Sequence, residues 1–79
     1  MNITVKLFAS LGQYSPEGES AKPFTFDIEQ GDSLKSLVRT LNIPEEDIRI
    51  KFVNGRTQDW DYRLQHDDEV GFFPPIGGG

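Results

Sequence analysis

The sequence predicts a single α+β domain, in which one main helix packs on one face of a mixed sheet. The chain has 79 residues, which is too few to bury two separate cores. Several short segments alternate apolar with polar residues, as half-buried strands do. Apolar residues at helical spacing mark one main segment near residues 33–42. A single helical stripe of this kind is buried most economically against one face of a sheet.

Two predicted strands precede the helix. They cover residues 3–8 and 24–28, where apolar side chains alternate with polar ones. The connection between them, residues 9–22, is rich in Gly, Ser and Glu and predicts a loop. One helical turn is expected around residues 10–14, and Gly12 weakens it.

The helix has a recognisable start and end. Gly31-Asp32-Ser33 supplies a turn and an N-cap, whose side-chain oxygen accepts an otherwise unpaired backbone N–H. The apolar stripe follows at positions i, i+3, i+4 and i+7: Leu34, Leu37, Val38 and Leu41. Pro44 disfavours helical geometry at Ile43 and predicts the end of the helix there.

Three further extended segments are predicted after the helix. Residues 48–53 alternate as a third strand, and Asn54-Gly55 then predicts a tight turn because both residues tolerate positive φ. Residues 59–64 suggest a short fourth strand or an extended stretch, and residues 65–68 a polar loop. Residues 70–73 form the last strand, which stops at two prolines because proline cannot donate to a sheet ladder.

Composition excludes several classes of function. A formal charge of −5 argues against nucleic acid as a partner, because phosphate binding needs a positive surface. It is compatible with a basic protein partner, and equally with solubility alone. There is no apolar run long enough to cross a membrane and no secretory signal, so we expect a cytoplasmic protein without a membrane partner. The absence of cysteine excludes disulfides, thiol nucleophiles and cysteine metal sites.

No catalytic or metal-binding constellation is evident. His66-Asp67-Asp68-Glu69 lacks convincing ligand spacing, and His66 is the only histidine. Asp59, Asp61 and Asp67 likewise do not form a convincing acid pair, so a polar loop is the better interpretation. We find no phosphate-binding glycine loop, nucleophile elbow or triad. We therefore expect no metal site and no enzyme activity from the chain by itself.

The C-terminal residues carry a specific pattern. They are Phe72-Phe73-Pro74-Pro75-Ile76-Gly77-Gly78-Gly79. Together with the preceding Asp68-Glu69-Val70, they resemble the MoaD/ThiS family of ubiquitin-like sulfur carriers, whose last strand runs into a terminal Gly-Gly. The Phe-Phe-Pro-Pro doublets resemble the molybdopterin synthase small subunit more than the thiamine sulfur carrier. Gly77 stands where the family usually has Ala, Ser or Thr, and the spacing from Pro75 to the terminus is preserved.

The resemblance implies a β-grasp fold over residues 1–73 and a flexible diglycine tail over residues 74–79. It implies that an ATP-using, ubiquitin-activating-type enzyme adenylates the carboxylate of Gly79, next to Gly78, and that a thiocarboxylate follows. No cofactor would be bound by the chain itself. The acceptor partner would be the large catalytic subunit of molybdopterin synthase or an equivalent enzyme. Because the chain has no cysteine, no side-chain thiol is available to carry the sulfur.

The tail residues suit insertion into a partner. Glycine has no Cβ, so Gly77 and the terminal diglycine fit a narrow channel. Pro74 and Pro75 favour an extended exit before Ile76 and lower the ordering cost of binding. The six residues from 74 to 79 span roughly 20 Å when extended.

Phe8 and Phe73 are candidates for a docking surface. Both are out of phase with the predicted buried residues of their strands, which are Ile3, Val5, Leu7, Val70 and Phe72. The first and last strands of a β-grasp are neighbours, so the two rings would form one exposed apolar patch. The alternative is that the loop after Phe8 folds over them.

Several functions remain open at this point. The favoured one is sulfur donation to a pterin precursor of the molybdenum or tungsten cofactor. The same carrier chemistry would serve thiamine, cysteine or another sulfur metabolite, or conjugation to protein lysines. A non-catalytic interaction module is an alternative of another class. The glycine tail would then be only a frayed end or a cloning remnant.

Overall fold

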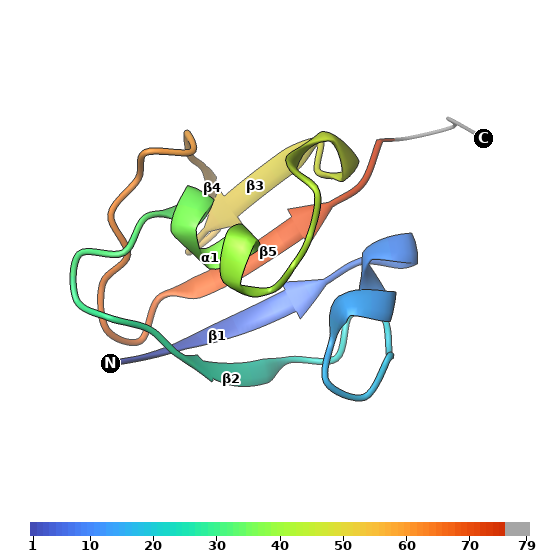
Figure 1. The fold of residues 1–79 in the computed structure, drawn as a ribbon, viewed down its shortest axis with the longest axis horizontal. Coiled ribbons are helices and arrows are strands. Elements are labelled where there is room, and N and C mark those ends of the chain that lie inside the picture. The colour runs from blue at the N-terminus through green and yellow to red at the C-terminus, as the bar shows by residue number, and fades with distance from the viewer. Residues whose placement is uncertain (76–79) are drawn as a thin grey trace.

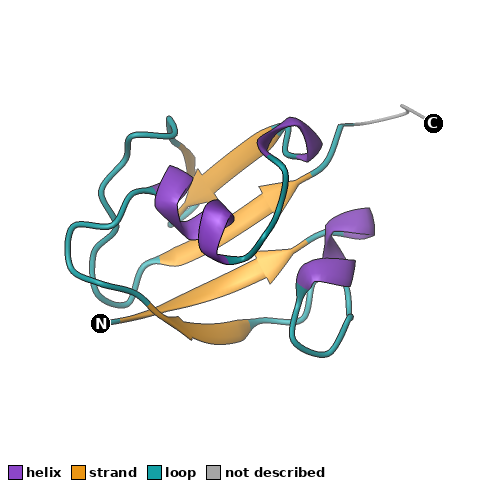
Figure 2. Ribbon diagram, in the orientation of Figure 1, coloured by secondary structure: helices purple, strands orange, loops and turns teal. Residues whose placement is uncertain are grey.

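A five-stranded mixed sheet with one α-helix across one of its faces makes up the fold (Figures 1 and 2). The computed structural model describes residues 1–75, so the expectations for Ile76, Gly77, Gly78 and Gly79 lie outside the described residues. The elements are β1 (Asn2–Leu7), a 3₁₀ helix (Ala9–Tyr14), β2 (Phe24–Asp27), α1 (Leu34–Thr40), a 3₁₀ helix (Glu45–Asp47), β3 (Ile50–Val53), β4 (Arg56–Thr57) and β5 (Glu69–Phe73). The predicted fold class is confirmed.

The strand order is β2-β1-β5-β3-β4, which places the last strand at the centre of the sheet. β5 runs parallel to β1, with Val5 beside Val70 and Leu7 beside Phe72, and it pairs with β3 in antiparallel fashion. The side chains of these four residues are at most 1% exposed and face α1. The core is completed by buried residues from the helix and the loops: Leu11, Leu34, Leu37, Val38, Ile43, Ile48 and Leu64.

The ends of α1 show one prediction confirmed and one wrong. The Ser33 hydroxyl oxygen accepts a hydrogen bond from the backbone N–H of Ser36 at 3.1 Å, as an N-cap should. Pro44 does not end the helix. The helix already stops at Thr40, because Asn42 adopts a left-handed conformation with φ 62°. The N–H groups of Asn42 and Ile43 then bond to the carbonyls of Arg39 and Val38, which is a Schellman motif.

The short strand after β3 lies earlier than expected. Asn54 and Gly55 both have positive φ, 52° and 82°, and form a two-residue hairpin turn. This turn pairs Val53 directly with Arg56, so β4 starts at once. Residues 59–64 form no strand and make only an isolated bridge through Arg63, because the sheet edge that they would pair with is already taken by β4.

Gly12 has a different role from the one expected. The 3₁₀ helix Ala9–Tyr14 confirms the predicted helical turn. A Cβ built on Gly12 would lie 2.7 Å from the backbone Cα of Ser20, closer than real contacts allow. Glycine is therefore needed here because the two backbones approach closely.

Within residues 1–75, no helix is long and apolar enough to cross a membrane.

Candidate functional site

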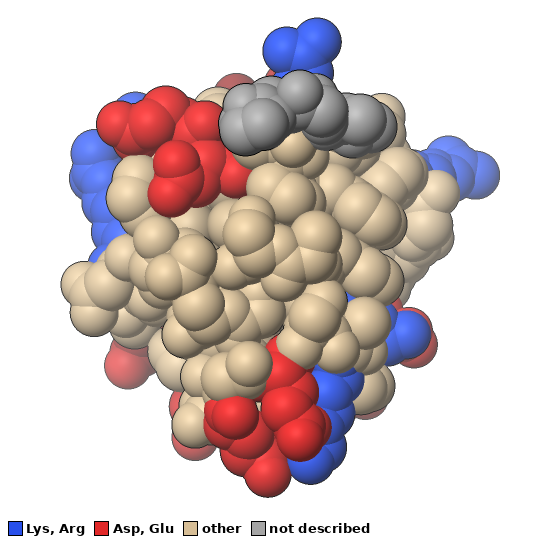
Figure 3. All heavy atoms as spheres, turned by 90° about the vertical axis from the view of Figure 1, so that its right-hand side faces the viewer, with Lys and Arg blue, Asp and Glu red and all other residues tan. Residues whose placement is uncertain are grey.

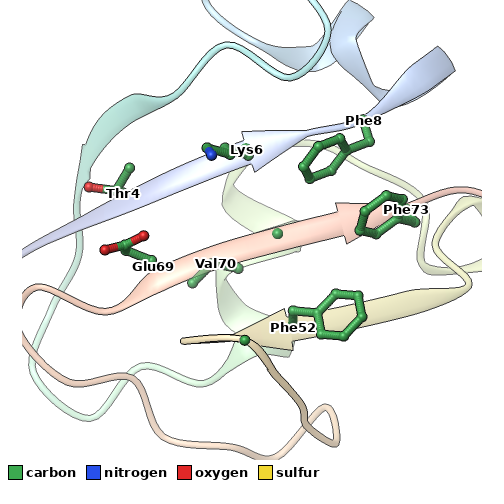
Figure 4. A pocket seen from close by; sticks show the side chains of 9 residues that line it. Thr4, Lys6, Phe8, Phe52, Glu69, Val70 and Phe73 are labelled. Atoms are coloured by element: carbon green, nitrogen blue, oxygen red, sulfur yellow. The ribbon is translucent and has the colours of Figure 1, made fainter.

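Three phenylalanine rings lie side by side on the sheet face opposite α1 (Figure 4). Phe8 follows β1, Phe73 ends β5, and Phe52 belongs to β3. The rings of Phe8 and Phe73 stack with centroids 4.1 Å apart and an interplanar angle of 2°. Phe52 meets Phe73 edge-on, at 5.7 Å and 81°. We call these three residues the ring cluster.

Phe8 and Phe73 are therefore neighbours in the fold, as the sequence predicts. Both rings remain partly exposed, so the segment after Phe8 does not bury them. Their role in partner binding stays a prediction. Parallel packing of two aromatic rings on an open sheet face leaves apolar surface in contact with water, which is typical of an interaction site.

A shallow hollow of about 360 Å³ adjoins the ring cluster. It is lined by Thr4, Lys6, Phe8, Phe52, Gly55, Glu69, Val70, Gly71 and Phe73. Gly71 lies between Lys6 of β1 and Phe52 of β3, and it has no side chain to fill the space above the sheet. A Cβ added at Gly71 would touch the ring of Phe8 at 3.4 Å. The hollow thus has a backbone floor, aromatic walls at one end, and the charges of Lys6 and Glu69 at the other (Figure 4).

Sequence reasoning missed Phe52 and Gly71. The segment 48–53 has apolar residues on both faces, and its alternation alone does not fix which face is inward. The structure buries Val53, at 2% exposed, and this turns Phe52 to the open face. The tight turn after Val53 fixes only its pairing with Arg56, whereas its place beside the buried Val70 comes from the pairing of β3 with β5, which no local signal predicts.

The chain leaves the sheet next to the ring cluster. The carbonyl of Phe73 accepts a hydrogen bond from the backbone N–H of Arg49 at 2.8 Å, which holds the end of β5. Pro74 is partly exposed and Pro75 is exposed. Figure 3 shows this end of the molecule: a mostly uncharged central surface, with clusters of acidic side chains at its edges.

A tyrosine and a carboxylate join the two 3₁₀ helices at this end. The hydroxyl of Tyr14 donates to Oδ2 of Asp47 at 3.4 Å. Burial raises the pKa of Tyr14, and the charge of Asp47 and this hydrogen bond raise it further. The Tyr14 ring also packs against the core, so the contact is structural.

The polar segment at 66–69 makes hydrogen bonds that hold neighbouring segments of the fold together. Nδ1 of His66 accepts from the backbone N–H of Asn2 at 3.3 Å, and Nε2 lies 3.4 Å from Asp67. Asp68 is only 5% exposed and accepts hydrogen bonds from several groups. In the described part of the chain, no three His, Cys, Asp or Glu side chains are grouped so as to hold a metal ion.

A parallel central strand pair, antiparallel outer strands and one helix across the sheet define a β-grasp, ubiquitin-like domain. Solved structures of similar fold include SAMP1 from Haloferax volcanii, with a TM-score of 0.72, 19% identity and full coverage of both chains. A putative molybdopterin converting factor subunit 1 from Pyrococcus furiosus has a TM-score of 0.72 and 24% identity over 96% of this chain and 99% of its own. The complex of subunits 1 and 2 of molybdopterin-converting factor from Helicobacter pylori gives a TM-score of 0.63 and 22% identity, with full coverage of both chains.

The chain belongs to the ThiS family, whose model matches residues 5–79. The match includes the terminal glycines and confirms the resemblance to the MoaD/ThiS sulfur carriers. The comparison with curated proteins gives no match.

Proposed function

We propose that this chain is a sulfur carrier protein whose C-terminal carboxylate, on Gly79, is adenylated and then converted to a thiocarboxylate. The observation that carries the proposal is the ThiS family match, which extends to residue 79. Two further facts support it. The chain has no cysteine, and β5 ends beside a partly exposed aromatic surface.

The chemistry explains why the chain end is used. A free carboxylate is a poor electrophile because its charge is delocalised and it has no good leaving group. Attack of a Gly79 carboxylate oxygen on the α-phosphorus of ATP would release pyrophosphate and form an acyl-adenylate. A sulfur donor would then attack the acyl carbon and release AMP. The resulting thiocarboxylate is a nucleophile that transfers its sulfur to an acceptor.

The proposal divides the roles between this chain and its partner enzymes. The chain supplies recognition through the ring cluster and reach through residues 74–79, with Pro74, Pro75, Ile76 and Gly77 contacting the partner. The adenylating enzyme supplies ATP and the catalytic groups, so the chain acts as a protein cosubstrate with no cofactor of its own. We place this activity in the cytoplasm, away from membranes and nucleic acid.

The proposed acceptor is the large catalytic subunit of a molybdopterin synthase, so that the sulfur enters the molybdenum or tungsten cofactor. The fold likeness to molybdopterin converting factor subunits from Pyrococcus furiosus and Helicobacter pylori favours this pathway. A second candidate is conjugation to protein lysines. It is favoured by the likeness to small archaeal modifier protein 1 of Haloferax volcanii, at a TM-score of 0.74. Thiamine, cysteine or another sulfur metabolite would use the same tail chemistry.

Intact-mass spectrometry tests the proposal. The purified chain is incubated with its adenylating enzyme, ATP and a sulfur donor. We expect the mass to increase by the difference between one sulfur and one oxygen. Deleting Gly79 should abolish the increase while leaving the circular dichroism spectrum unchanged, since residue 79 follows the last strand. A full-length chain that stays an ordinary carboxylate beside a competent enzyme would refute the carrier function and leave an interaction module as the better account.

The product of the loaded chain separates the two pathways. Loss of the added sulfur on mixing with a large subunit and a pterin precursor supports molybdopterin synthesis. An isopeptide bond between Gly79 and a lysine of another protein supports conjugation.

A further inference from the structure

Asn54 lies at the turn between β3 and β4. The side chain of Asn54 bridges this turn to the start of β5 by two hydrogen bonds. Its Nδ2 donates to Oδ1 of Asp68 at 2.9 Å, and its Oδ1 accepts from the backbone N–H of Glu69 at 2.9 Å. The backbone N–H of Asn54 also donates to the carbonyl of Glu69 at 2.8 Å. We call this arrangement the Asn54 clamp.

The acceptor of the clamp is a buried carboxylate. Asp68 is 5% exposed, and its Oδ2 accepts from the hydroxyl of Tyr62 at 3.2 Å and from the backbone N–H of Gln65 at 2.8 Å. The Nδ2 group of Asn54 completes this set at Oδ1. A buried carboxylate is tolerated only while such donors surround it. A side chain at position 54 that donates a hydrogen bond to Oδ1 of Asp68 therefore stabilises this carboxylate.

Asn54 is followed by glycine, and this makes its carboxamide chemically vulnerable. The backbone nitrogen of Gly55 has no neighbouring Cβ to hinder its attack on Cγ of Asn54. Attack forms the C–N bond of a succinimide, breaks the Cγ–Nδ2 bond, and releases ammonia, which takes up the proton lost from the Gly55 nitrogen. Water then opens the ring to aspartate or isoaspartate. The other two asparagines, Asn2 and Asn42, each precede a β-branched isoleucine that hinders the same attack.

We propose that Asn54 is a deamidation site that the folded protein holds closed through the clamp, and whose reaction disables the clamp permanently. To reach the Gly55 nitrogen, the carboxamide has to leave both of its partners, Asp68 and the first residue of β5, Glu69. Asn54 is exposed, so water is available to complete the reaction once this happens. Local opening of the hairpin thus controls the rate. The inference is independent of the proposed function.

The product cannot restore the contact. Aspartate at position 54 has no donor for Asp68, and it places a second negative charge beside a buried carboxylate. Isoaspartate also lengthens the backbone of a two-residue turn and disturbs the pairing of Val53 with Arg56. Either product loosens the hairpin whose β3 strand carries Phe52 of the ring cluster.

Deamidation rates in the folded and unfolded chain test this inference. The full chain is incubated at mildly alkaline pH with and without denaturing guanidinium chloride, then digested with trypsin. Cleavage after Lys51 and Arg56 isolates Asn54 in the peptide Phe52-Val53-Asn54-Gly55-Arg56. We expect Asn54 to react at least about tenfold more slowly in the folded chain than in the unfolded chain. The reason is that two hydrogen bonds of modest net strength have to break before the carboxamide can reach the Gly55 nitrogen. Asn42 serves as the internal control, and in the unfolded chain it should react much more slowly than Asn54. If the deamidation rate of Asn54 in the unfolded chain exceeds its rate in the folded chain by less than about tenfold, the proposal is overturned.

A matched pair of variants tests the consequence. Asn54→Asp mimics the aspartate product, whereas Asn54→Gly removes the same hydrogen bonds without adding charge and suits the positive φ. We expect a lower guanidinium midpoint for Asn54→Asp than for Asn54→Gly, with similar slopes. An Asn54→Asp midpoint equal to or above that of Asn54→Gly would show that the charge beside Asp68 is harmless and would contradict the proposed loss of the clamp.

Discussion

Phe73→Asp is the most informative test of the docking surface. Phe73 is the central ring of the cluster, because it stacks on Phe8 and meets Phe52 edge-on. Each aromatic pair contributes about 0.5–1.5 kcal/mol beyond area burial, so losing both costs about 1–3 kcal/mol of folding free energy. For a domain of this size, each kcal/mol lowers the melting temperature by roughly 4–8 °C. The variant should therefore melt earlier and still fold at room temperature.

The effect on binding should be larger. An aromatic residue at the centre of an interface costs about 2–4 kcal/mol when truncated, which is roughly 30-fold to 1,000-fold in affinity. Phe8→Asp loses one ring pair instead of two, so it should destabilise the fold less while weakening binding comparably. Isothermal titration calorimetry against the adenylating enzyme or the large subunit measures the affinity. Thermal unfolding of the free chain measures stability.

Gln30→Asp is the matched control. It adds the same charge to an exposed residue at the opposite end of the molecule, near the contact of Ile28 with Met1 at the start of β1. We expect its affinity to equal that of the wild type. If Phe8→Asp and Phe73→Asp both bind as tightly as Gln30→Asp, the ring cluster is not the docking surface.

Three further predictions concern the fold and are checked by thermal or guanidinium unfolding. Gly12→Ala should cost about 1–3 kcal/mol, because its Cβ would lie 2.7 Å from the backbone of Ser20; an unchanged midpoint would contradict this close approach. Asn42→Val should cost about 1–2 kcal/mol through its left-handed backbone, whereas Asn42→Gly should be tolerated; equal stability of the two variants would argue against the Schellman end. Burial, then the charge of Asp68 and the hydrogen bond to it, raise the pKa of Tyr62, so its contribution is intact below about pH 10 and falls as the pH rises further. Tyr62→Phe should lose about 1 kcal/mol at neutral pH and show a weaker decline at alkaline pH; an identical alkaline decline in both proteins would refute this assignment.

Local patterns in the sequence were sufficient to predict most elements. Alternation located β1 and β2, and the stripe after Ser33 located α1, because these signals depend on residues within one element. For residues 59–64 a short strand or an extended stretch was predicted, and the strand alternative was wrong, because the residues right after the turn form β4 at the sheet edge. Helix termination was assigned to Pro44, although Asn42 adopts the left-handed conformation first.

The site was less predictable because it depends on contacts between distant segments. The pairing of Phe8 with Phe73 followed from strand phase together with the expected fold. The role of Asp68 did not, because its donors come from residues 54, 62 and 65, and the local segment looks like a solvated loop. The role of Gly71 could not be predicted from the local sequence either. A glycine in a strand leaves space above the sheet, and only the fold shows that the ring of Phe8 lies beside this space.

The position of β5 explains how one chain end can be both anchored and available. β5 is the last strand and also a central one, held on one side by β1 and on the other by β3. Phe72 is fully buried, whereas the next residue, Phe73, belongs to the partly exposed ring cluster. A force applied to residue 74 therefore acts against two ladders of hydrogen bonds, so a partner can draw in the tail without opening the core.

The same arrangement limits the geometry of any partner. If the ring cluster docks and Gly79 reacts, the partner's active site has to lie within roughly 20 Å of the surface that receives Phe73, since residues 74–79 connect the two. The adenylating enzyme and the acceptor enzyme would both meet this limit, because both use the same terminus. They would then compete for the ring cluster, and the chain would have to dissociate from the first enzyme before it delivers sulfur to the second.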